Sequence, residues 1–432
     1  MIDLDDLRKR PDAYKKAAKD KRIAVDVDAF LKLDARRKEI MPKIEEIRAK
    51  QNAASKKIPS MKGAEKDAAL AEMKTLSAKG KEIDEELKIA EVSWKEMQLL
   101  LPAIPLPTVP VGKDDKENVE NRKIGDPAKL KIAGTKDHVT LGEELGIIDF
   151  PRAAKVAGAR SYFLIGDGAR LHQAVLRYTM DSLTKKGWTL FAPPLMASAE
   201  CLMGTGFFPG AEEQTYAIGA HKNQNDPLES DKLYLIGTSE VTVCSFHKDE
   251  TLKEVDLPKR YAGYSACFRR EAGTYGKDTK GLYRVHQFEK VEQVVLCRAD
   301  EKESLAMFEE IRGNAEDVLK ALELPYRIID VCTGDMGKGK VFMQDIETWM
   351  PSRNGYGETH SCSYLGDFQA RRLGIKYETK DGQKKFVHTL NNTCIASPRI
   401  LIPILEIYQN KDGTVTIPEA LRPYMDGQKV IK

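Results

Sequence analysis

Residues 267–292 read CFRREAGTYGKDTKGLYRVHQFEKVE and predict two strands joined by a basic loop. We expect the first strand over residues 264–270, a mobile loop over 272–281 and the second strand over 282–296. Arginine binds phosphate, a carboxylate accepts hydrogen bonds from a base or ribose, and an aromatic ring stacks on a base. The hairpin thus has the residue types of a nucleotide site, although a solvated hairpin explains the stretch equally well when it is taken alone.

The composition is that of a globular protein with more than one domain. The chain has 432 residues, of which 41% are hydrophobic and 31% charged, and its net charge is only +3. At this length two or three domains are expected. Any contact with nucleic acid must come from a local basic patch, because the net charge provides no strong global field.

Cysteine usage and hydropathy predict the compartment. The seven cysteines form no CxxC pair, so we expect a reducing compartment, no zinc site and no disulfide framework. The N-terminus is charged from residue 3 and has no apolar signal segment. The longest apolar run, residues 400–405, is too short to span a membrane. These features predict a cytoplasmic protein without a membrane partner.

Two heptad repeats predict a helical hairpin over residues 29–101, which turns at residues 58–63. One row of seam positions in each repeat, spaced by seven residues, holds Leu33, Ile40, Ile47 and Ala54, and then Leu76, Ile83, Ala90 and Met97. Such spacing is typical of an antiparallel coiled coil when the two helices are joined by a short turn. We expect Pro42 to kink the first helix, and Gly80 to thin the packing of the second.

The tip of this hairpin is basic. Five lysines surround it, namely Lys50, Lys56, Lys57, Lys62 and Lys66. A projecting rod with a basic tip can lie along a phosphate backbone. A solvated lysine face or a dimerisation coil is the alternative interpretation.

A proline cluster over residues 102–110 marks a linker, and we place a domain boundary near residue 112. Beyond it, helices are expected over 169–186, 301–322 and 397–409, and a glycine-rich loop over 203–210. Strands separated by short turns dominate 187–300 and 325–395. This order predicts an α+β domain with a mainly antiparallel sheet, because helices do not alternate with the strands.

Residues 334–340, GDMGKGK, match the spacing of a phosphate-binding loop. The next residue is Val341, which has no hydroxyl group for magnesium. The following segment, residues 341–349, is predicted to be a strand, whereas a phosphate-binding loop precedes a helix. We therefore reject this interpretation.

Three elements occur together in the second domain. They are a helix and strand that end at Pro194, the pair FRRE (268–271) and RVHQF (284–288), and LNNT (390–393) followed by Arg399. In this order they resemble motifs 1, 2 and 3 of class II aminoacyl-tRNA synthetases. Nearly the whole chain resembles the seryl-tRNA synthetases of the common bacterial and eukaryotic type, with TSE (238–240), TGDMG (333–337), DIETWMPS (345–352), ETHSCS (358–363) and FQARR (368–372).

The resemblance implies a site for ATP, serine and Mg²⁺. Arg269 and Arg399 would be catalytic, and Glu358 and Ser361 would bind the metal through the hard oxygen atoms that magnesium prefers. The implied ATP-binding residues are Arg269, Arg270, Glu271, Arg284, Val285, His286, Gln287, Phe288, Glu358, Thr359, His360, Ser361 and Arg399. The implied serine-binding residues are Thr238, Ser239, Glu240, Arg269, Glu292 and Thr393.

The resemblance also implies a reaction and its partners. Serine and ATP would form seryl-adenylate and pyrophosphate, and the seryl group would pass to the 3′ end of tRNA(Ser). A tRNA-binding domain over residues 1–112, with the lysine tip, would precede a catalytic domain over 113–432, and two copies would form a homodimer around Pro194. Whether tRNA(Sec) is also charged stays open.

Two alternatives stay open at this point, and three departures from the family pattern accompany them. The alternatives are a paralogue that loads a carrier protein and a non-catalytic tRNA-binding paralogue. The departures are Tyr364-Leu365 after SCS, Phe207-Phe208 after GTG, and Pro403 within the motif 3 helix. None of them replaces a matched ligand.

Overall fold

The computed structural model describes residues 1–220, 229–273 and 280–432. The expectation of a mobile loop with Lys277 lies outside these residues, whereas Lys280 is exposed. The chain forms two compact units, Ile2–Ile104 and Pro105–Lys432, with Met1 in the second. In the ranges that are described, no helix is long and apolar enough to cross a membrane.

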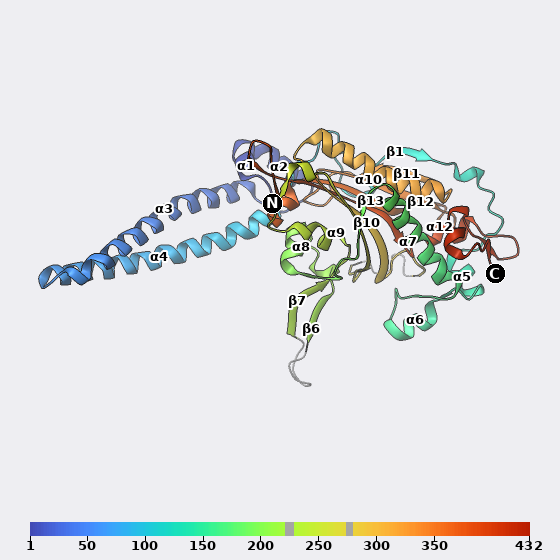
Figure 1. The fold of residues 1–432 in the computed structure, drawn as a ribbon, viewed down its shortest axis with the longest axis horizontal. Helices are drawn as coiled ribbons and strands as arrows, with labels where there is room; N and C mark the ends of the chain where they lie inside the picture. Colours follow the sequence, from blue (N-terminus) through green and yellow to red (C-terminus); the bar gives the residue numbers. More distant parts are fainter. Residues whose placement is uncertain (221–228, 274–279) are drawn as a thin grey trace. The chain divides into compact units, whose positions relative to one another are not determined.

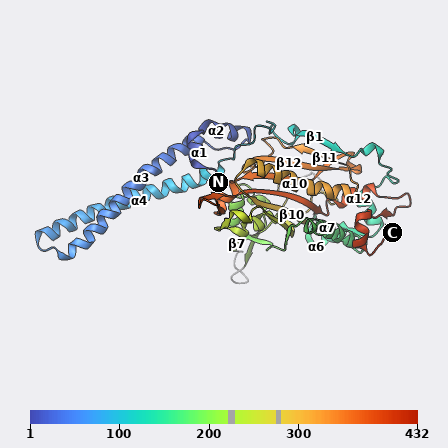
Figure 2. The same cartoon turned by 45° about the horizontal axis from the view of Figure 1, so that its top comes forward.

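The first unit consists of two short helices and a long helical hairpin. Its helices are α1 (Leu4–Lys9), α2 (Pro11–Asp20), α3 (Val27–Lys57) and α4 (Ala64–Leu100). Asp26 caps α3, since its side chain accepts a hydrogen bond from the backbone N–H of Ala29. Helices α3 and α4 lie side by side (Figure 1, Figure 2), which confirms the predicted helical hairpin and is consistent with an antiparallel coiled coil.

The seam of the hairpin follows the predicted heptads. Phe30, Ile40, Ile44 and Ile47 of α3 are buried, and so is Ala90 of α4. The repeat positions of α4 are buried or half-buried throughout, at Met73, Leu76, Gly80, Ile83, Leu87, Ala90, Trp94 and Met97.

Helix α3 continues through Pro42 to Lys57, so the proline does not end it, and a kink there stays a prediction. One expectation about the hairpin needs correction. Gly80 does not thin the packing, because a Cβ atom at this position would lie 3.2 Å from Cγ2 of Ile47. The glycine instead lets the two helices approach closely.

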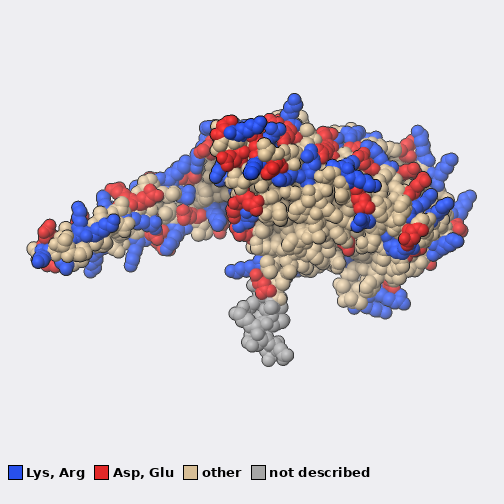
Figure 3. Space-filling view, in the orientation of Figure 1, with Lys and Arg blue, Asp and Glu red and all other residues tan. Residues whose placement is uncertain are grey.

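The five lysines at the turn of the hairpin are all exposed. Lys50 forms an ion pair with Glu46 one turn earlier, at 2.7 Å. Figure 3 shows blue and red side chains alternating along the arm, as expected of a solvated coiled coil. The tip is therefore a local basic patch on an otherwise mixed surface.

A buried carboxylate ties α1, α3 and α4 together at the base of the arm. Asp34, whose side chain is 5% exposed, accepts hydrogen bonds from Nε of Arg8 at 2.8 Å and from Nε1 of Trp94 at 3.2 Å. Burial favours the neutral carboxyl group, but the hydrogen bonds and charge of Arg8 outweigh it and lower the pKa of Asp34.

Asp34→Ala is expected to destabilise the base of the arm by about 1–3 kcal/mol, since Arg8 and Trp94 would each lose a buried acceptor. The measurement is amide hydrogen exchange of α3 and α4 in the full chain. Because the pKa of Asp34 is lowered in the fold, its stabilisation is present above its unfolded pKa and is lost as the pH falls through its folded pKa. Asp84→Ala, which removes an exposed partner of Arg48, is the control and should change protection by less than about 0.5 kcal/mol.

The second unit is built on an eight-stranded sheet with the strand order β1-β11-β12-β13-β16-β10-β9-β4 (Figure 1, Figure 2). All neighbouring strands are antiparallel except β4 and β9, which are parallel. The strands are β1 (Val119–Ile124), β4 (Thr189–Phe191), β9 (Lys259–Phe268), β10 (Gln287–Cys297), β11 (Tyr326–Asp330), β12 (Phe342–Met350), β13 (Gly355–Gly366) and β16 (His388–Ser397). This sheet confirms the predicted α+β class with a mainly antiparallel sheet.

Smaller elements surround the sheet. The remaining strands are β2 (Ile148–Asp149), β3 (Phe163–Leu164), β5 (Met196–Ser198), β6 (Ala217–Ala220), β7 (Glu229–Leu235), β8 (Thr251–Lys253), β14 (Lys376–Glu378), β15 (Lys384–Phe386), β17 (Val415–Thr416) and β18 (Val430–Ile431). The helices are α5 (His138–Glu144), α6 (Phe150–Ala157), α7 (Asp167–Lys185), α8 (Ala199–Thr205), α9 (Glu240–Cys244), α10 (Glu301–Ala321), α11 (Phe368–Leu373) and α12 (Leu401–Ile407).

Helices α7 and α10 cover one face of the central strands. Two buried amides join the sheet to α10, because Gln293 of β10 and Asn392 of β16 both donate to the carbonyl oxygen of Ile311, at 2.8 and 2.6 Å. The main hydrophobic core lies in this layer and includes Phe308 and Val291. The opposite face of the same strands does not pack against α7 or α10.

Several predicted boundaries were wrong. Strand β10 begins at Gln287 and not at 282, because its pairing with β9 ends at Phe268. Residues 203–205 belong to helix α8, which ends at Gly206 in the left-handed conformation, so this segment is not wholly a loop. Pairing of Ser397 with Glu289 extends β16 to residue 397, and the following helix begins only at Leu401.

The three departures from the family pattern are accommodated. Pro403 lies in the first turn of α12, where its missing N–H needs no acceptor within the helix. Phe208 is buried and packs edge-on against Tyr234. Tyr364 and Leu365 are buried as well.

Candidate active site

A cavity of about 460 Å³ lies over the open face of β10, β16 and β13. It receives residues from the predicted motif 2 and motif 3 regions and from the segments around residues 206, 238, 338 and 361. The predicted site residues that line it are Thr238, Glu240, Arg269, Glu271, Val285, Phe288, Glu292, Glu358, Thr359, Ser361, Thr393 and Arg399.

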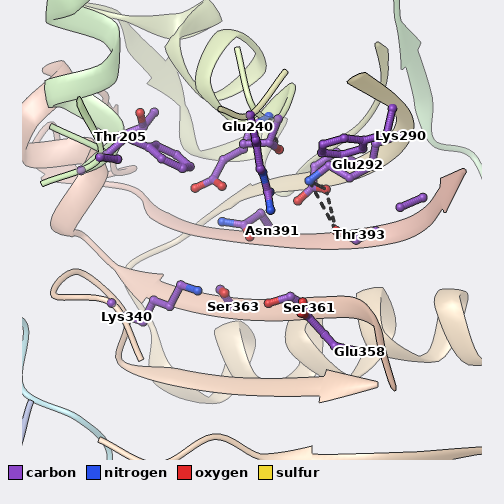
Figure 4. Close-up of a pocket in the computed structure, with 18 of the residues that line it drawn as sticks. Thr205, Glu240, Lys290, Glu292, Lys340, Glu358, Ser361, Ser363, Asn391 and Thr393 are labelled. Carbon is purple, nitrogen blue, oxygen red and sulfur yellow. Dashed lines mark hydrogen bonds and ion pairs between the residues drawn. The ribbon is translucent and has the colours of Figure 1, made fainter. Parts of the chain in front are cut away.

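The alternation of strand residues explains how the cavity acquires its polar lining. On β10, Phe288, Lys290 and Glu292 are two residues apart and all line the cavity. Asn391 and Thr393 on β16 and Ser361 and Ser363 on β13 follow the same rule (Figure 4). The intervening residues face α10 instead, as Asn392 does through its bond to Ile311.

Two arginines line one end of the cavity. The Arg269 guanidinium lies 5.3 Å from the ring centre of Phe288, and its Nη2 donates to the carbonyl oxygen of Gly237 at 3.4 Å. Arg399 donates from Nη1 to the carbonyl oxygen of Glu358 and from Nε to that of Tyr283, both at 2.9 Å. This end therefore offers positive charge and an aromatic face, as a nucleotide requires.

A buried ion pair lines the part of the cavity over β10 and β16. Lys290 Nζ lies 2.6 Å from Oε2 of Glu292, and Thr393 Oγ1 donates to the same oxygen at 3.2 Å (Figure 4). The Lys290 and Glu292 side chains are only 6% and 3% exposed. The sheet register places Glu292 opposite Thr393, so the network is a consequence of strand pairing.

Glu240 is a second buried carboxylate that lines the cavity. Burial, and then the negative charge of Glu292, raise the pKa of Glu240 to about 7. Gln369 of α11 donates from Nε2 to Oε1 of Glu240 at 2.7 Å and to the carbonyl oxygen of Thr205 at 3.0 Å. The Thr238 hydroxyl accepts from the Glu240 N–H at 3.2 Å, which orients the turn before α9.

Oxygen donors gather on β12 and β13. Glu358 and Ser361 line the cavity, and burial together with the Glu358 charge raises the pKa of Asp345 well above its usual value. Within the described ranges, no three or more histidine, cysteine, aspartate or glutamate residues form a ready-made metal cluster. A cation here would therefore need oxygen atoms from a bound ligand in addition to Glu358 and Ser361.

Six predicted site residues do not line this cavity. Arg284 forms an ion pair with Glu271 at 2.7 Å, and the Arg270 side chain is exposed. His286 and Gln287 line a second cavity of about 490 Å³. Ser239 donates to the carbonyl oxygen of Gly263 at 3.1 Å.

The sixth of these residues, His360, is buried. Burial lowers the pKa of His360 to about 3, so its imidazole is neutral at physiological pH. This neutral, buried ring does not line the cavity, although the resemblance places His360 among the ATP-binding residues.

The cavity residues that the sequence analysis missed include Lys290, Lys338, Lys340 and Asn391. A signal existed for Lys290 and Asn391, because each is two residues from a predicted ligand on the same strand. Lys338 and Lys340 come from the rejected GDMGKGK segment. The strand β12 begins two residues after it, which confirms that no phosphate-loop helix follows.

Two family models match the chain. Residues 1–105 match the seryl-tRNA synthetase N-terminal domain, and residues 223–408 match the tRNA synthetase class II core domain (G, H, P, S and T). The two matched segments fall in the helical unit and in the unit that contains the cavity.

Relatives are similar over their full length. Serine–tRNA ligase of Deinococcus radiodurans is 46% identical, with 100% of this chain and 99% of the relative covered. Serine–tRNA ligase of Symbiobacterium thermophilum is 41% identical, with complete coverage of both.

Solved structures agree with this. Seryl-tRNA synthetase from Pyrococcus horikoshii, complexed with ATP, has a TM-score of 0.86 and 37% identity, covering 100% of this chain and 99% of that one. The cytoplasmic serine–tRNA ligase of Naegleria fowleri, in complex with AMP, has a TM-score of 0.82 and 31% identity, covering 98% and 95%. These findings confirm the resemblance and the assignment as an ATP-dependent aminoacyl-tRNA ligase. The chain belongs to the seryl-tRNA synthetase family of class II aminoacyl-tRNA synthetases.

Proposed function

We propose that the chain attaches serine to the 3′ end of tRNA(Ser) in two steps, with ATP as the energy source. The observation that carries the proposal is one cavity that combines cationic and aromatic groups with the buried Glu292–Thr393 pair. The relatives from Pyrococcus horikoshii and Naegleria fowleri bind ATP and AMP, which supports the nucleotide assignment.

In the first step, a carboxylate oxygen of serine attacks the α-phosphorus of ATP. The bond from that phosphorus to the bridging oxygen breaks, and pyrophosphate leaves. Arg269 contacts the α-phosphate and the serine carboxylate, and Arg399 contacts the γ-phosphate from the opposite side. Both act by positioning and by neutralising charge, because the nucleophile is already ionised and needs no protein base.

The nucleotide is held by the hairpin of β9 and β10. Phe288 stacks on adenine, and Glu271 accepts from the adenosine. Arg284, already paired with Glu271, contacts the terminal phosphates. In the second step, a hydroxyl group of the terminal ribose of tRNA attacks the carbonyl carbon of the seryl-adenylate, and AMP leaves.

The polar end selects serine. Glu292 accepts from the serine ammonium group, and Thr393 together with Glu292 binds the serine hydroxyl. Thr238 and Glu240 line the same end. Alanine is rejected because it would leave these buried polar groups without a partner, a difference worth roughly 10⁴-fold in such sites.

Magnesium fits the oxygen donors of the cavity. Glu358 and Ser361 would hold it together with phosphate oxygens, and Mg²⁺ would there neutralise charge on the phosphates. The chemistry of the donor set supports this, since neither residue is a soft ligand. Titration of pyrophosphate exchange with Mg²⁺ is the test, and activity that persists in excess chelator would contradict it.

We further propose that residues 1–112 form the tRNA-binding domain and 113–432 the catalytic domain of a cytoplasmic homodimer. Exposed apolar side chains around Pro194, namely Leu190, Leu195 and Met196, support a dimer contact there. Sedimentation equilibrium tests the dimer, and cell fractionation tests the compartment. Charging assays with purified tRNA(Sec) decide whether this second tRNA is a substrate.

Serine-dependent exchange of pyrophosphate into ATP tests the proposed function. The assay should be run with each of the twenty amino acids, and only serine is expected to give rapid exchange. Absence of exchange with serine, or equal exchange with another amino acid, would refute the proposal.

A further inference from the structure

Lys290, Glu292 and Thr393 form a closed network at the inner end of the cavity, here called the Lys290 network. Lys290 Nζ and Thr393 Oγ1 both bind the same atom, Oε2 of Glu292, at 2.6 and 3.2 Å respectively. Lys290 Nζ also lies 3.4 Å from Thr393 Oγ1, so the three groups form a triangle. Among the residues that the structure describes, none forms a hydrogen bond or ion pair with Oε1 of Glu292, the other oxygen of the carboxylate.

The charges at this end are unbalanced without Lys290. Glu240 and Glu292 are both buried, and they lie close together. The negative charge of Glu292 contributes to the raised pKa of Glu240, which is about 7. Two close carboxylates in a buried site ordinarily share a proton. A shared proton would compete with the ammonium group of an amino acid for the same oxygen atoms.

We propose that Lys290 is a positioning residue that holds Oε2 of Glu292, so that Oε1 is presented to the ammonium group of serine. The proposal rests on the proposed function, in which Glu292 binds serine. Lys290 acts through Glu292 and does not need to touch the substrate. It places a cation next to the two buried carboxylates, Glu240 and Glu292.

Other titratable groups near Glu292 cannot replace Lys290. Lys340 and Lys290 both contribute positive charge at Glu240, but only Lys290 lies within hydrogen-bonding distance of Glu292. Arg269 lies over Phe288 and, in the proposed reaction, binds the serine carboxylate rather than Glu292. Burial, together with the negative charge of Glu292, raises the pKa values of three thiols. These thiols therefore stay neutral: Cys267, Cys362 and Cys394.

Lys290→Met is expected to lower kcat/KM for serine by roughly 30-fold or more at neutral pH, because one partner of a buried charge pair is lost. The KM for ATP should change by less than about threefold. Removing the Lys290 charge raises the pKa of Glu240 further above about 7, and serine must then bind against the additional proton on Glu240. The loss should therefore shrink as the pH rises from about 6.5 to about 8, by up to about tenfold per pH unit.

A double-mutant cycle with Glu292→Gln separates this role from a structural one. If Lys290 acts only through Glu292, adding Lys290→Met to Glu292→Gln should not lower kcat/KM for serine any further. The double variant also removes the unpaired charge, so it should fold even if Lys290→Met alone does not. Lys290→Arg, which keeps the cation, should restore most of the activity and the wild-type pH profile.

Lys302→Met, on the exposed side of α10, is the matched control and should behave like the wild type. A loss in Lys290→Met that is independent of pH, or that adds fully to that of Glu292→Gln, would overturn the proposal. An inactive wild type in serine-dependent exchange would instead refute the proposed function. The two failures are therefore distinguishable.

Discussion

Arg269→Ala is expected to lower serine-dependent pyrophosphate exchange by about 10³-fold or more, the range found when an arginine that stabilises a phosphoryl transition state is removed. Arg269 directly follows β9 and lines the cavity, where its guanidinium lies 5.3 Å from the ring centre of Phe288. In the proposed reaction it contacts both reactants, the α-phosphate and the serine carboxylate. Its loss removes charge neutralisation and alignment together.

The measurement is kcat/KM for serine in the exchange assay, with thermal unfolding as a check of the fold. Arg269 is exposed and lies at the end of a strand, so the variant should fold like the wild type. Arg269→Lys keeps the charge but loses the planar, two-pronged donor, and intermediate activity is expected. Full activity in Arg269→Ala would refute the assigned role.

Replacing residues 29–101 by a short flexible linker is expected to abolish tRNA charging while sparing adenylate formation. The reason is that all the proposed ligands of ATP and serine lie in the unit Pro105–Lys432, whereas the basic tip lies in the other unit. Charging at physiological salt should fall by about 100-fold or more, since phosphate contacts supply much of the affinity for nucleic acid. Exchange should stay within about threefold of the wild type.

The five lysines of the tip provide a graded version of this experiment. Changing them to serine should weaken charging and flatten its dependence on salt, because fewer counterions are released on binding. The same substitutions at Lys81 and Lys95, exposed on α4 away from the turn, serve as the matched control. Unchanged charging in the deletion variant would contradict a tRNA-binding arm and would favour the alternative of another acceptor.

The arm shows how much of a local structure can be predicted from a periodic sequence. A seven-residue repeat places Ile40, Ile47 and Ala90 on one side of a helix whatever the rest of the chain does, because the helix has a fixed number of residues per turn. The role of Gly80 could not be predicted in this way. Whether a missing side chain leaves a gap or permits a close approach depends on the partner helix, here on Ile47.

The sequence predicted a mainly antiparallel sheet correctly, but it did not predict where the individual strands begin and end. Alternation and turn residues identified most strands, yet the start of β10 and the end of β16 depend on the residues opposite them, Phe268 and Glu289. The apolar residues just before Gln287 fit a buried loop as well as a strand, so the pattern does not show where the strand begins. Leu282, for example, is buried while its N–H binds Nε2 of His138.

The sequence by itself determined the family, the two-part organisation and the motif residues, because ordered motifs and heptads are properties of the chain alone. Only the tertiary structure decided which charges meet. Period-two spacing already places Lys290 and Glu292 on one face of β10. That this face also holds Thr393 from β16 and faces Glu240 from α9 depends on pairings between segments far apart in sequence. The energy of a buried charge is set by these distant neighbours, and so the chemistry of the inner cavity could not be predicted from local pattern.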